Sequence, residues 1–364
     1  MSPPKLAGAA FVRRLEEYFS ETLGREVRVL DVEPLGSDAD KGLGYGVPHR
    51  VTLDSGEPRS VVIHRSTVSG YGHDRPSDRA AMALLGWETF GTFPNHVRPL
   101  DVGLVDAQGQ MRSMQEARDY YLVTEWGEGT PYAHDLRDVA ARGALLPRDQ
   151  VRMEKLADLL AVAHDDARES DELWRRRTRD VFGGHEGIAG VLDSYDGHAL
   201  DGYTSREELL TIEQRCAALR HRAKDMRGRL RRIHGDFHPW NILFGEGDQP
   251  VLLDRSRGEW GDPADDVAAL TINYLFFALR QGPTFDGPFA ALWNGFFERY
   301  LAKRPDPELA LALPGHLVWR ALVVASPAWY PHLEPATRRA LFRFIAGVLR
   351  DERFDHRSVS QLIS

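Results

Sequence analysis

The chain has 364 residues, of which 42% are apolar and 27% charged, so two compact globular units are expected and a disordered or collagen-like chain is excluded. A net charge of −8 argues against a dedicated nucleic-acid binder, and a single cysteine, Cys216, excludes an intrachain disulfide. We expect neither a signal peptide nor a membrane-spanning segment, and together with the lone cysteine this favours the cytoplasm.

The first third of the sequence predicts a small antiparallel sheet with helices. Apolar residues at helical spacing predict a helix over 11–23, which ends at Gly24, and a second helix is expected over 77–90. The segments that predict strands are short, rich in β-branched residues and separated by turn-forming residues. They cover 27–32, 47–53, 60–64, 96–105 and 119–125.

The segment Trp-Gly-Glu-Gly-Thr-Pro at 126–131 marks the best boundary in the chain, because its glycines and proline break the last strand. Long helices are predicted after it, together with a buried apolar helix near 267–279. The long helices cover 147–167, 205–232, 288–299, 314–324 and 334–349. We therefore expect an α+β fold with an N-terminal sheet lobe at 1–125, a hinge at 126–131 and a larger helical lobe at 132–364.

One non-helical island, 233–262, lies among these helices and carries several polar residues of interest. Two short apolar strands predict a hairpin there, which can bring Asp236, Asn241 and Asp254 together at one edge. Mg²⁺ takes oxygen ligands, so a carboxylate and a carboxamide beside a free carboxylate are the groups that phosphoryl transfer uses. Asp236 and Asn241 also have the spacing of the base and the metal-binding Asn in the kinase pattern H-R-D-x-x-x-x-N.

Two motifs of the island resemble those of the aminoglycoside phosphotransferase and choline kinase superfamily, whose members share a protein-kinase-like fold. The first is His234-Gly-Asp-Phe-His-Pro-Trp-Asn241, which matches H-G-D-x-x-x-x-N. The second is Asp254 with Gly261-Asp-Pro-Ala-Asp-Asp-Val-Ala268, which matches D-x6-G-D-P-x-x-D-L-A with Val for Leu. The order of a sheet lobe before a helical lobe agrees with this resemblance.

The resemblance implies a role for each matched residue. Asp236 would orient and deprotonate an acceptor hydroxyl. Asn241 and Asp254 would be the Mg²⁺ ligands. His234 would brace the catalytic loop, 234–241, through a hydrogen bond.

Further roles implied by the resemblance are structural or are carried by the main chain. Asp262 would tie the catalytic loop, and Asp266 would lie at or near the cap of the following helix. Glu125 and Trp126 fall where the family's interlobe hinge offers backbone groups to adenine. Asp78 stands near the position of the family's helix-borne Glu, although an ordinary first-turn acid explains it equally well.

The segments expected to bind the phosphates of the nucleotide match the family less closely. The glycine-rich segment 35–46 lies where a nucleotide-covering loop belongs, and a flexible hairpin tip is the alternative. Its candidate nucleotide-binding residues are Gly36, Ser37, Lys41, Gly42 and Gly44. His64 stands where the kinase V-A-I-K pattern has its lysine, so the phosphate-binding cation is either a protonated His64 or one of Arg65, Arg50 and Lys41.

The acceptor side of the site is the least defined. The arginine-rich segment 174–180 is most simply a solvated helix face, and the glycine-rich loop 182–187 is expected to border the acceptor pocket. The predicted activity is an aminoglycoside-phosphotransferase-like O-phosphotransferase that uses ATP or GTP with Mg²⁺ and acts on a small-molecule hydroxyl. We expect a monomer or homodimer without nucleic-acid or membrane partners.

Two alternatives to this activity stay open. One is a metabolic kinase for choline, sugars or amino alcohols. The other is a nucleotide-binding pseudokinase, because the strand lysine is replaced by His64.

Overall fold

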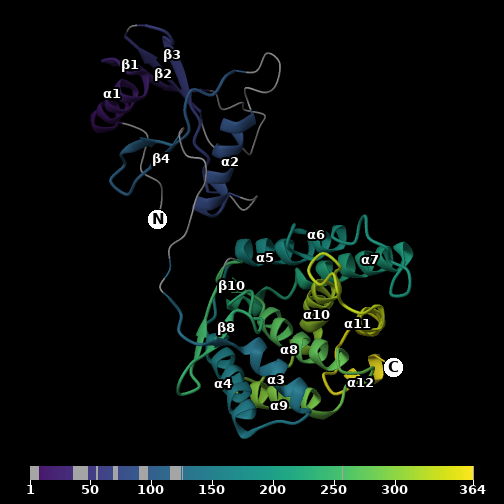
Figure 1. The fold of residues 1–364 in the computed structure, drawn as a ribbon. Helices are drawn as coiled ribbons and strands as arrows, with labels where there is room; N and C mark the ends of the chain where they lie inside the picture. Colours follow the sequence, from purple (N-terminus) through teal and green to yellow (C-terminus); the bar gives the residue numbers. More distant parts are fainter. Residues whose placement is uncertain are drawn as a thin grey trace. The chain divides into compact units, whose positions relative to one another are not determined.

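The computed structural model describes residues 8–35, 48–54, 56–68, 73–89, 97–114, 124, 126–255 and 257–363. The chain divides into two compact units, Met1–Thr124 and Glu125–Ser364, whereas the sequence-based division ends the first lobe at residue 125. Figure 1 shows strands and helices in the purple-to-blue first unit and mainly helices in the second. The α+β class predicted from the sequence is confirmed.

A helix and a three-stranded sheet form the core of the first unit. The helix is α1 (Ala9–Leu23), and the strands are β1 (Val29–Pro34), β2 (His49–Leu53) and β3 (Ser60–Ile63), antiparallel in the order β1-β2-β3. α1 presents one apolar face at helical spacing to the sheet. The buried residues of this cluster are Phe11, Leu15, Tyr18 and Phe19 from α1, with Val27, Val51, Leu53 and Val61.

The rest of the first unit contains α2 (Pro76–Thr89) and a hairpin of β4 (Gly103–Val105) and β5 (Met111–Ser113). The strand predicted over 96–105 is therefore shorter than expected. Its partner is β5, and most of the strand predicted over 119–125 lies outside the described residues. Asp106 explains the turn, because its Oδ1 accepts the backbone N–H groups of Gln108 at 3.0 Å and Gln110 at 2.9 Å.

The second unit opens with a series of helices. They are α3 (Tyr132–Arg142), α4 (Pro147–Ala163), α5 (Asp171–Gly183), α6 (Ile188–Asp193) and α7 (Arg206–Ala223). The Ser170 hydroxyl caps α5 and the Ser205 hydroxyl caps α7. The helix predicted to reach Arg232 ends at Ala223, and the chain continues through a 3₁₀ turn into β7 (Arg231–Arg232).

Short strands frame the island between these helices and the next ones. β6 (Thr130–Pro131), β8 (Ile242–Phe244) and β9 (Pro250–Leu252) form one antiparallel sheet in the order β6-β8-β9, and β7 pairs with β10 (Trp260–Gly261). Ile242 lies opposite Leu252 in the β8–β9 hairpin. The predicted hairpin is thus present, and it places the residues before β8 beside those after β9.

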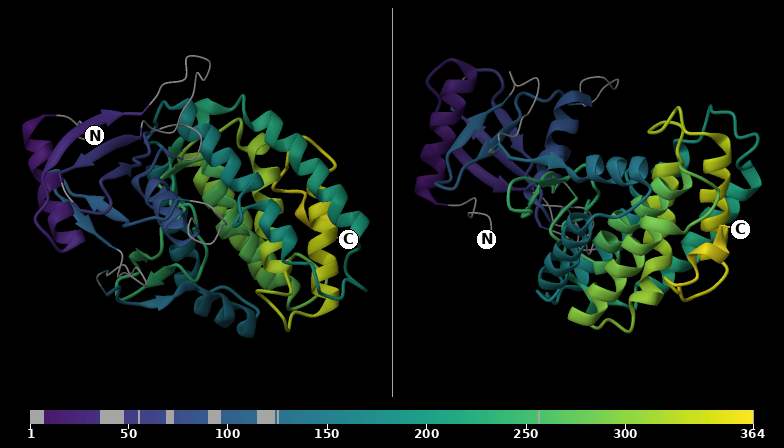
Figure 2. Two further views of the ribbon diagram at one scale, coloured as in Figure 1. Left: turned by 90° about the horizontal axis from the view of Figure 1, so that it is seen from above. Right: turned by 60° about the horizontal axis from the view of Figure 1, so that its bottom comes forward.

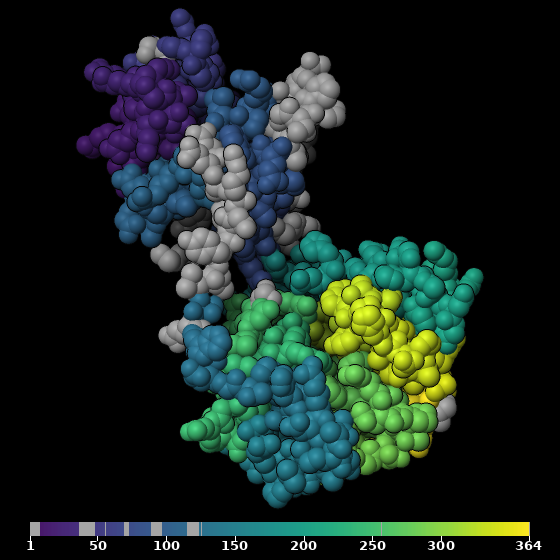
Figure 3. Space-filling model, viewed as in Figure 1, coloured from purple at the N-terminus to yellow at the C-terminus, as the bar shows by residue number. Residues whose placement is uncertain are grey.

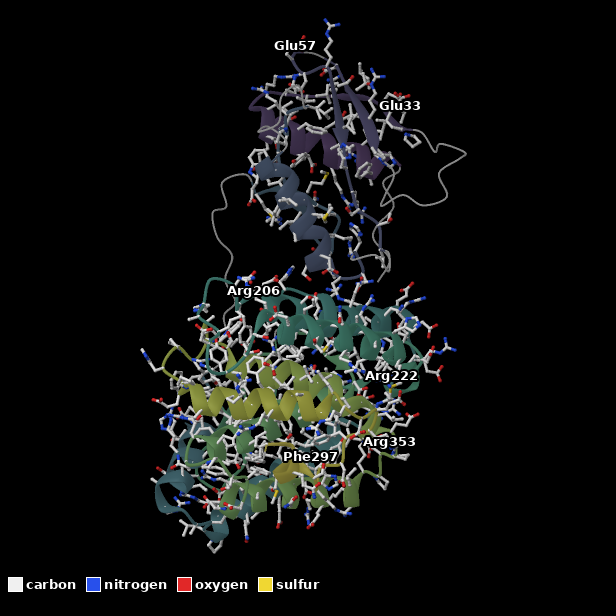
Figure 4. The ribbon with its side chains drawn as sticks, turned by 90° about the vertical axis from the view of Figure 1, so that its right-hand side faces the viewer. Glu33, Glu57, Arg206, Arg222, Phe297 and Arg353 are labelled. Atoms are coloured by element: carbon white, nitrogen blue, oxygen red, sulfur yellow. The ribbon has the colours of Figure 1, made fainter. Side chains whose placement is uncertain are left out.

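α8 (Pro263–Leu279) is buried along its whole length and is the buried helix that the sequence predicts. It packs against α9 (Gly287–Lys303), α10 (Leu309–Ala325) and α11 (Pro335–Val348), and α12 (Val359–Leu362) follows. In both views of Figure 2 the yellow C-terminal helices lie beside the green ones, and Phe297, labelled in Figure 4, belongs to the same apolar core. None of the helices in the described ranges is long and apolar enough to cross a lipid bilayer.

Pro314 lies inside α10, which begins at Leu309 and not at the proline as the sequence predicts. A proline has no backbone N–H, so the carbonyl of Ala310 loses its partner within the helix. The backbone N–H of Phe354 donates to this carbonyl at 2.8 Å. A segment distant in the sequence thus satisfies the carbonyl that Pro314 leaves unpaired.

Candidate active site

A buried carboxylate anchors the start of the catalytic loop. Asp266, in the first turn of α8, accepts the backbone N–H groups of His234 and Gly235, each at 2.7 Å. Its Oδ2 lies 3.2 Å from Nε2 of His164, and Nδ1 of that histidine is hydrogen-bonded to the hydroxyl of Tyr300 at 2.8 Å. Asp266 and His164 are fully buried, so the loop is fixed to the interior of the helical unit.

Asp262 caps α8. Its Oδ1 accepts the backbone N–H of Ala264 at 2.9 Å, and both of its oxygens bind the guanidinium of Arg229. Burial raises the pKa of Asp262, but Arg229 outweighs burial and holds this pKa below its usual range. The predicted roles of Asp262 and Asp266 are therefore exchanged, because Asp266 contacts the loop and Asp262 caps the helix.

Two arginines bind one oxygen of the Asp236 carboxylate. Arg320 of α10 donates to Oδ1 at 2.7 Å, and Arg257 donates to the same atom at 2.8 Å. Burial raises the pKa of Asp236, but Arg320 and Arg257 outweigh burial and hold this pKa below its usual range. Oδ2 lies 3.6 Å from Nε2 of His238, beyond hydrogen-bond distance. The carboxylate is thus ionised at neutral pH, with Oδ2 able to accept a hydrogen bond.

The ion pairs continue from Asp236 into the interior of the unit. Arg320 also donates to Oδ1 of Asp265 at 2.6 Å, and Oδ2 of that carboxylate pairs with Arg177 of α5. Asp265 is fully buried and both arginines are 5% exposed. The interpretation of 174–180 as a solvated helix face is therefore wrong for Arg177, which turns inward and completes a buried chain of four charges.

Arg257 connects Asp236 to the loop between α5 and α6. Its Nε donates to Oε2 of Glu186 at 3.1 Å, and its guanidinium lies 5.3 Å from the ring centroid of Trp319. The indole N–H of Trp319 donates to the backbone oxygen of Glu186 at 2.9 Å. The loop 182–187, which is expected to border the acceptor pocket, is thus tied to a residue that binds Asp236. Sequence reasoning named neither Arg257 nor Arg320.

The His234 side chain lies within the catalytic loop. Its Nδ1 accepts the backbone N–H of Asp236 at 3.3 Å, and its ring packs edge-on against Phe237. The imidazole therefore contacts the main chain of Asp236, as the predicted bracing role requires. We treat His234 as a candidate positioning residue.

The candidate metal ligands flank the β8–β9 hairpin. The Asn241 amide N–H donates to the backbone oxygen of Asp236 at 3.1 Å, which leaves the amide oxygen for a cation. The backbone N–H of Leu253 donates to the Asn241 backbone oxygen at 2.9 Å, so Asp254 immediately follows the residue paired with Asn241. The Asp254 side chain is exposed and accepts no hydrogen bond from the part of the chain that the structure describes.

These two oxygen donors fit a hard cation. Across the described ranges no three His, Cys, Asp or Glu side chains are grouped to hold a metal ion. Mg²⁺ needs no such group, because it commonly takes one or two protein ligands and completes its shell with phosphate and water. Asp254 also has a φ of 48°, which is uncommon for a residue other than glycine and recurs at functional sites.

The structure covers the predicted nucleotide-binding residues only in part. Gly36, Ser37, Lys41, Gly42, Gly44 and Glu125 lie outside the described residues. Trp126 is 84% exposed. His64 directly follows β3 and is exposed, as is Val62, in agreement with strand alternation. Arg65 is half-buried, and its pKa is lowered by burial and then by Arg79.

Two other residues considered for the phosphate side make ordinary contacts within the first unit. Arg50 pairs with Glu33 at 3.2 Å on the surface of the sheet. Asp78 accepts the backbone N–H of Arg75 at 2.8 Å, the contact of a residue at the start of a helix. This hydrogen bond agrees with the interpretation of Asp78 as an ordinary first-turn acid.

Residues 79–307 match a family model described as a phosphotransferase enzyme family. The match covers more than half of the chain and includes both motifs of the island. A comparison with curated proteins gives no match.

The chain also resembles several solved structures. A macrolide 2′-phosphotransferase type I has 15% identity over 93% of this chain and 99% of that chain, with a TM-score of 0.31. A choline kinase from Streptococcus pneumoniae has 13% identity over 94% and 99%, with a TM-score of 0.36. A glucosamine kinase in complex with glucosamine, ADP and inorganic phosphate has 17% identity over 64% and 56%, with a TM-score of 0.34, so this chain spans about half of that protein.

Proposed function

Because the chain belongs to the phosphotransferase enzyme family, we propose that it transfers the γ-phosphoryl group of ATP or GTP to a hydroxyl group of a small molecule, with Mg²⁺. The observation that carries the proposal is the Asp236 carboxylate. It is buried and ionised, and two arginines bind one oxygen while the other faces no donor within hydrogen-bond distance in the described residues. This state suits a group that receives a hydrogen bond from a hydroxyl.

Asp236 orients the acceptor in this mechanism. Oδ2 accepts the hydrogen bond of the acceptor hydroxyl and aims its oxygen in line with the γ-phosphorus. As the bond from this oxygen to phosphorus forms, the bond from phosphorus to the nucleoside diphosphate breaks and the hydroxyl proton passes to Oδ2. The low pKa of Asp236 is compatible with this role, because a loose transition state releases the proton late and a weak base suffices.

The amide oxygen of Asn241 and the carboxylate of Asp254 are the proposed holders of Mg²⁺. When bound, Mg²⁺ neutralises charge on the phosphate oxygens. Glu125 and Trp126 are proposed to offer main-chain groups to the base of the nucleotide, and the glycine-rich segment with Gly36, Ser37, Lys41, Gly42 and Gly44 to cover its phosphates.

Replacing Asp254 tests the metal assignment. Asp254→Ala is expected to abolish the Mg²⁺-dependent rise in Tm that ATP produces, because the variant lacks the carboxylate ligand. The free energy of unfolding without ligand should change by no more than about 1–2 kcal/mol, since the side chain is exposed and the main cost is the left-handed backbone, which alanine tolerates less well than aspartate. Glu246→Ala, at an exposed position in the same hairpin, is the matched control. Unfolding of the ligand-free variant would show a structural role, and an unchanged ATP effect would remove Asp254 from the metal site.

His64 is proposed to supply the cation that the strand lysine provides in kinases. His64→Lys is expected to retain or raise activity. His64→Ala is expected to raise the nucleotide KM by more than Arg65→Ala does, because strand alternation puts the two side chains on opposite faces, with His64 exposed and Arg65 half-buried. Steady-state kinetics of these variants with Lys41→Ala and Arg50→Ala decide the point. If His64→Ala leaves the nucleotide KM unchanged while Lys41→Ala or Arg50→Ala raises it strongly, His64 is not the cation, and the residue with the strong effect supplies it.

A pseudokinase is the alternative from another class, and the replacement of the lysine by His64 is what favours it. Asp236, Asn241 and Asp254 argue for the enzyme, because a scaffold has no evident need of all three. Consumption of ATP and GTP should be screened with aminoglycosides, macrolides, sugars, amino alcohols including choline, and nucleosides. At least one acceptor is expected to raise consumption above that of Asp236→Asn. Nucleotide binding with no acceptor-dependent consumption would identify a pseudokinase.

A further inference from the structure

A pocket of about 210 Å³ lies inside the helical unit, between α5, α7 and α10. In Figure 3 the teal segment of α5–α7 adjoins the yellow segment of α10 and α11. The walls of the pocket are mainly apolar and include Trp174, Val181, Phe182, Leu219, Met226 and Leu311. Two exposed lining residues, Arg222 and Glu352, mark its outer edge and form an ion pair at 2.5 Å. Arg222 is labelled in Figure 4.

The pocket is separate from the proposed acceptor site. Arg177 lines it, and the ion pairs of Arg177, Asp265 and Arg320 stand between it and Asp236. In the described part of the chain no lining residue of the pocket makes a hydrogen bond or ion pair with Asp236. A molecule in this pocket would therefore not be the acceptor that Asp236 orients.

The charged residues of the lining already have partners. The pairs are Arg177–Asp265, Asp262–Arg229 and Arg222–Glu352. An ionic ligand would lose its hydration among apolar walls, and the charged lining residues are already paired with other side chains. Burial of an unpaired charge costs free energy. The pocket is therefore suited to a neutral molecule.

Two polar atoms of the lining, Nδ1 of His316 and Nε of Arg177, are buried without a hydrogen-bond partner in the part of the chain that the structure describes, and the imidazole of His316 is the uncharged group of the two. His316 of α10 is 7% exposed, its Nδ1 has no hydrogen-bond partner, and its Nε2 has none among the described residues. A buried polar group without a hydrogen bond costs free energy, so a ligand that supplies one is favoured. Burial lowers the pKa of His316, and the neutral imidazole offers one donor and one acceptor.

We propose that this pocket binds a small neutral aromatic molecule with one hydrogen-bonding group, and that His316 is its polar contact. Trp174 and Phe182 of α5 supply aromatic walls, on which a flat ring packs favourably. The pocket thus combines a mainly apolar surface with a few polar groups, among which the neutral imidazole of His316 can fix the orientation of a ligand, as in small-molecule sites. The proposal does not depend on the phosphotransferase activity.

Indole and indene are suitable probes, because they have nearly the same shape and only indole carries an N–H. With the full chain and no nucleotide, saturating indole is expected to raise Tm by about 2–4 °C and indene by less. His316→Phe should remove the difference between the two probes. The same variant should keep or raise the Tm of the free protein, since an unpaired imidazole is replaced by an apolar ring.

Ala312→Trp is designed to fill the pocket from α10 and is expected to abolish the Tm shift with both probes. Leu210→Trp, at an exposed position of α7, is the control and should leave both shifts unchanged. If Ala312→Trp does not fold, Leu311→Trp takes its place. Absence of any shift in the wild type, shifts that persist in the filled variant, or an advantage of indole that survives His316→Phe would each overturn the proposal.

Discussion

Asp236→Asn is expected to lower turnover by ~100-fold or more while the affinity for the Mg²⁺–nucleotide complex changes by no more than a few-fold. The amide has nearly the shape of the carboxylate, but it cannot take the proton of the acceptor hydroxyl. Nucleotide contacts proposed for other residues are not altered. Steady-state turnover, together with calorimetric titration of the nucleotide, measures the two effects separately.

Asp138→Asn is the matched control for this variant, because Asp138 is an exposed aspartate of α3 with no ion pair among the described residues. It should leave both turnover and nucleotide affinity unchanged. Near-normal turnover in Asp236→Asn would remove Asp236 from the mechanism. A large loss of nucleotide affinity would show that the variant disturbs more than the acceptor.

Arg320→Met is expected to lower the free energy of unfolding by about 3–5 kcal/mol at neutral pH, because it takes a partner from two buried carboxylates at once. Arg320 binds Asp236 and Asp265, and the methionine can offer neither of them a hydrogen bond. Urea unfolding of the variant and the wild type measures the loss. Arg215→Met, at an exposed position of α7, is the control and should change stability by no more than ~0.5 kcal/mol.

The pH dependence of this loss follows from two lowered pKa values. Burial opposes the shift, but the arginines hold the pKa of Asp236 and of Asp265 below the unfolded value of about 3.9. Their ion pairs therefore contribute stability above about pH 4, and this contribution is lost as the pH falls toward the folded pKa values. The difference between wild type and Arg320→Met should shrink below about pH 4. A difference that is independent of pH would show that lost packing, not lost charge pairing, causes the destabilisation.

The fold class and the enzyme family could be predicted from the sequence because short motifs carry them. The order of a sheet unit before a helical unit predicts the α+β fold, and the spacing of Asp236 and Asn241 predicts the phosphotransferase class. Both predictions are confirmed. The individual roles of Asp236, His234, Asn241 and Asp254 stay predictions.

Asp262 and Asp266 have each other's predicted roles, which shows that motif spacing alone does not determine which acid caps the helix. The segment from 262 to 266 holds three acids, and which one caps α8 depends on where the helix begins. Pro263 was an available signal, because proline favours the first helical position and so identifies the preceding residue as the cap.

The buried ion pairs of Arg177 and Arg320 were missed because their partners are distant in the sequence. Arg177 shares its helix face with Trp174, Thr178 and Val181, so helical spacing alone places it on the buried side of α5. Arg320 lies within an apolar stretch of α10, where a charged side chain needs a buried partner. Both signals indicate burial, but neither identifies the carboxylate that the arginine meets.

The most direct test of the account is ³¹P NMR of the reaction with the acceptor that the nucleotide screen identifies. The wild type is expected to form a phosphate monoester of the acceptor in a one-to-one ratio with nucleoside diphosphate, and Asp236→Asn is expected to form it at least ~100-fold more slowly. Nucleotide consumed without a phosphate ester, or an ester formed equally fast by Asp236→Asn, would contradict the assignment of Asp236 as the residue that orients the acceptor hydroxyl.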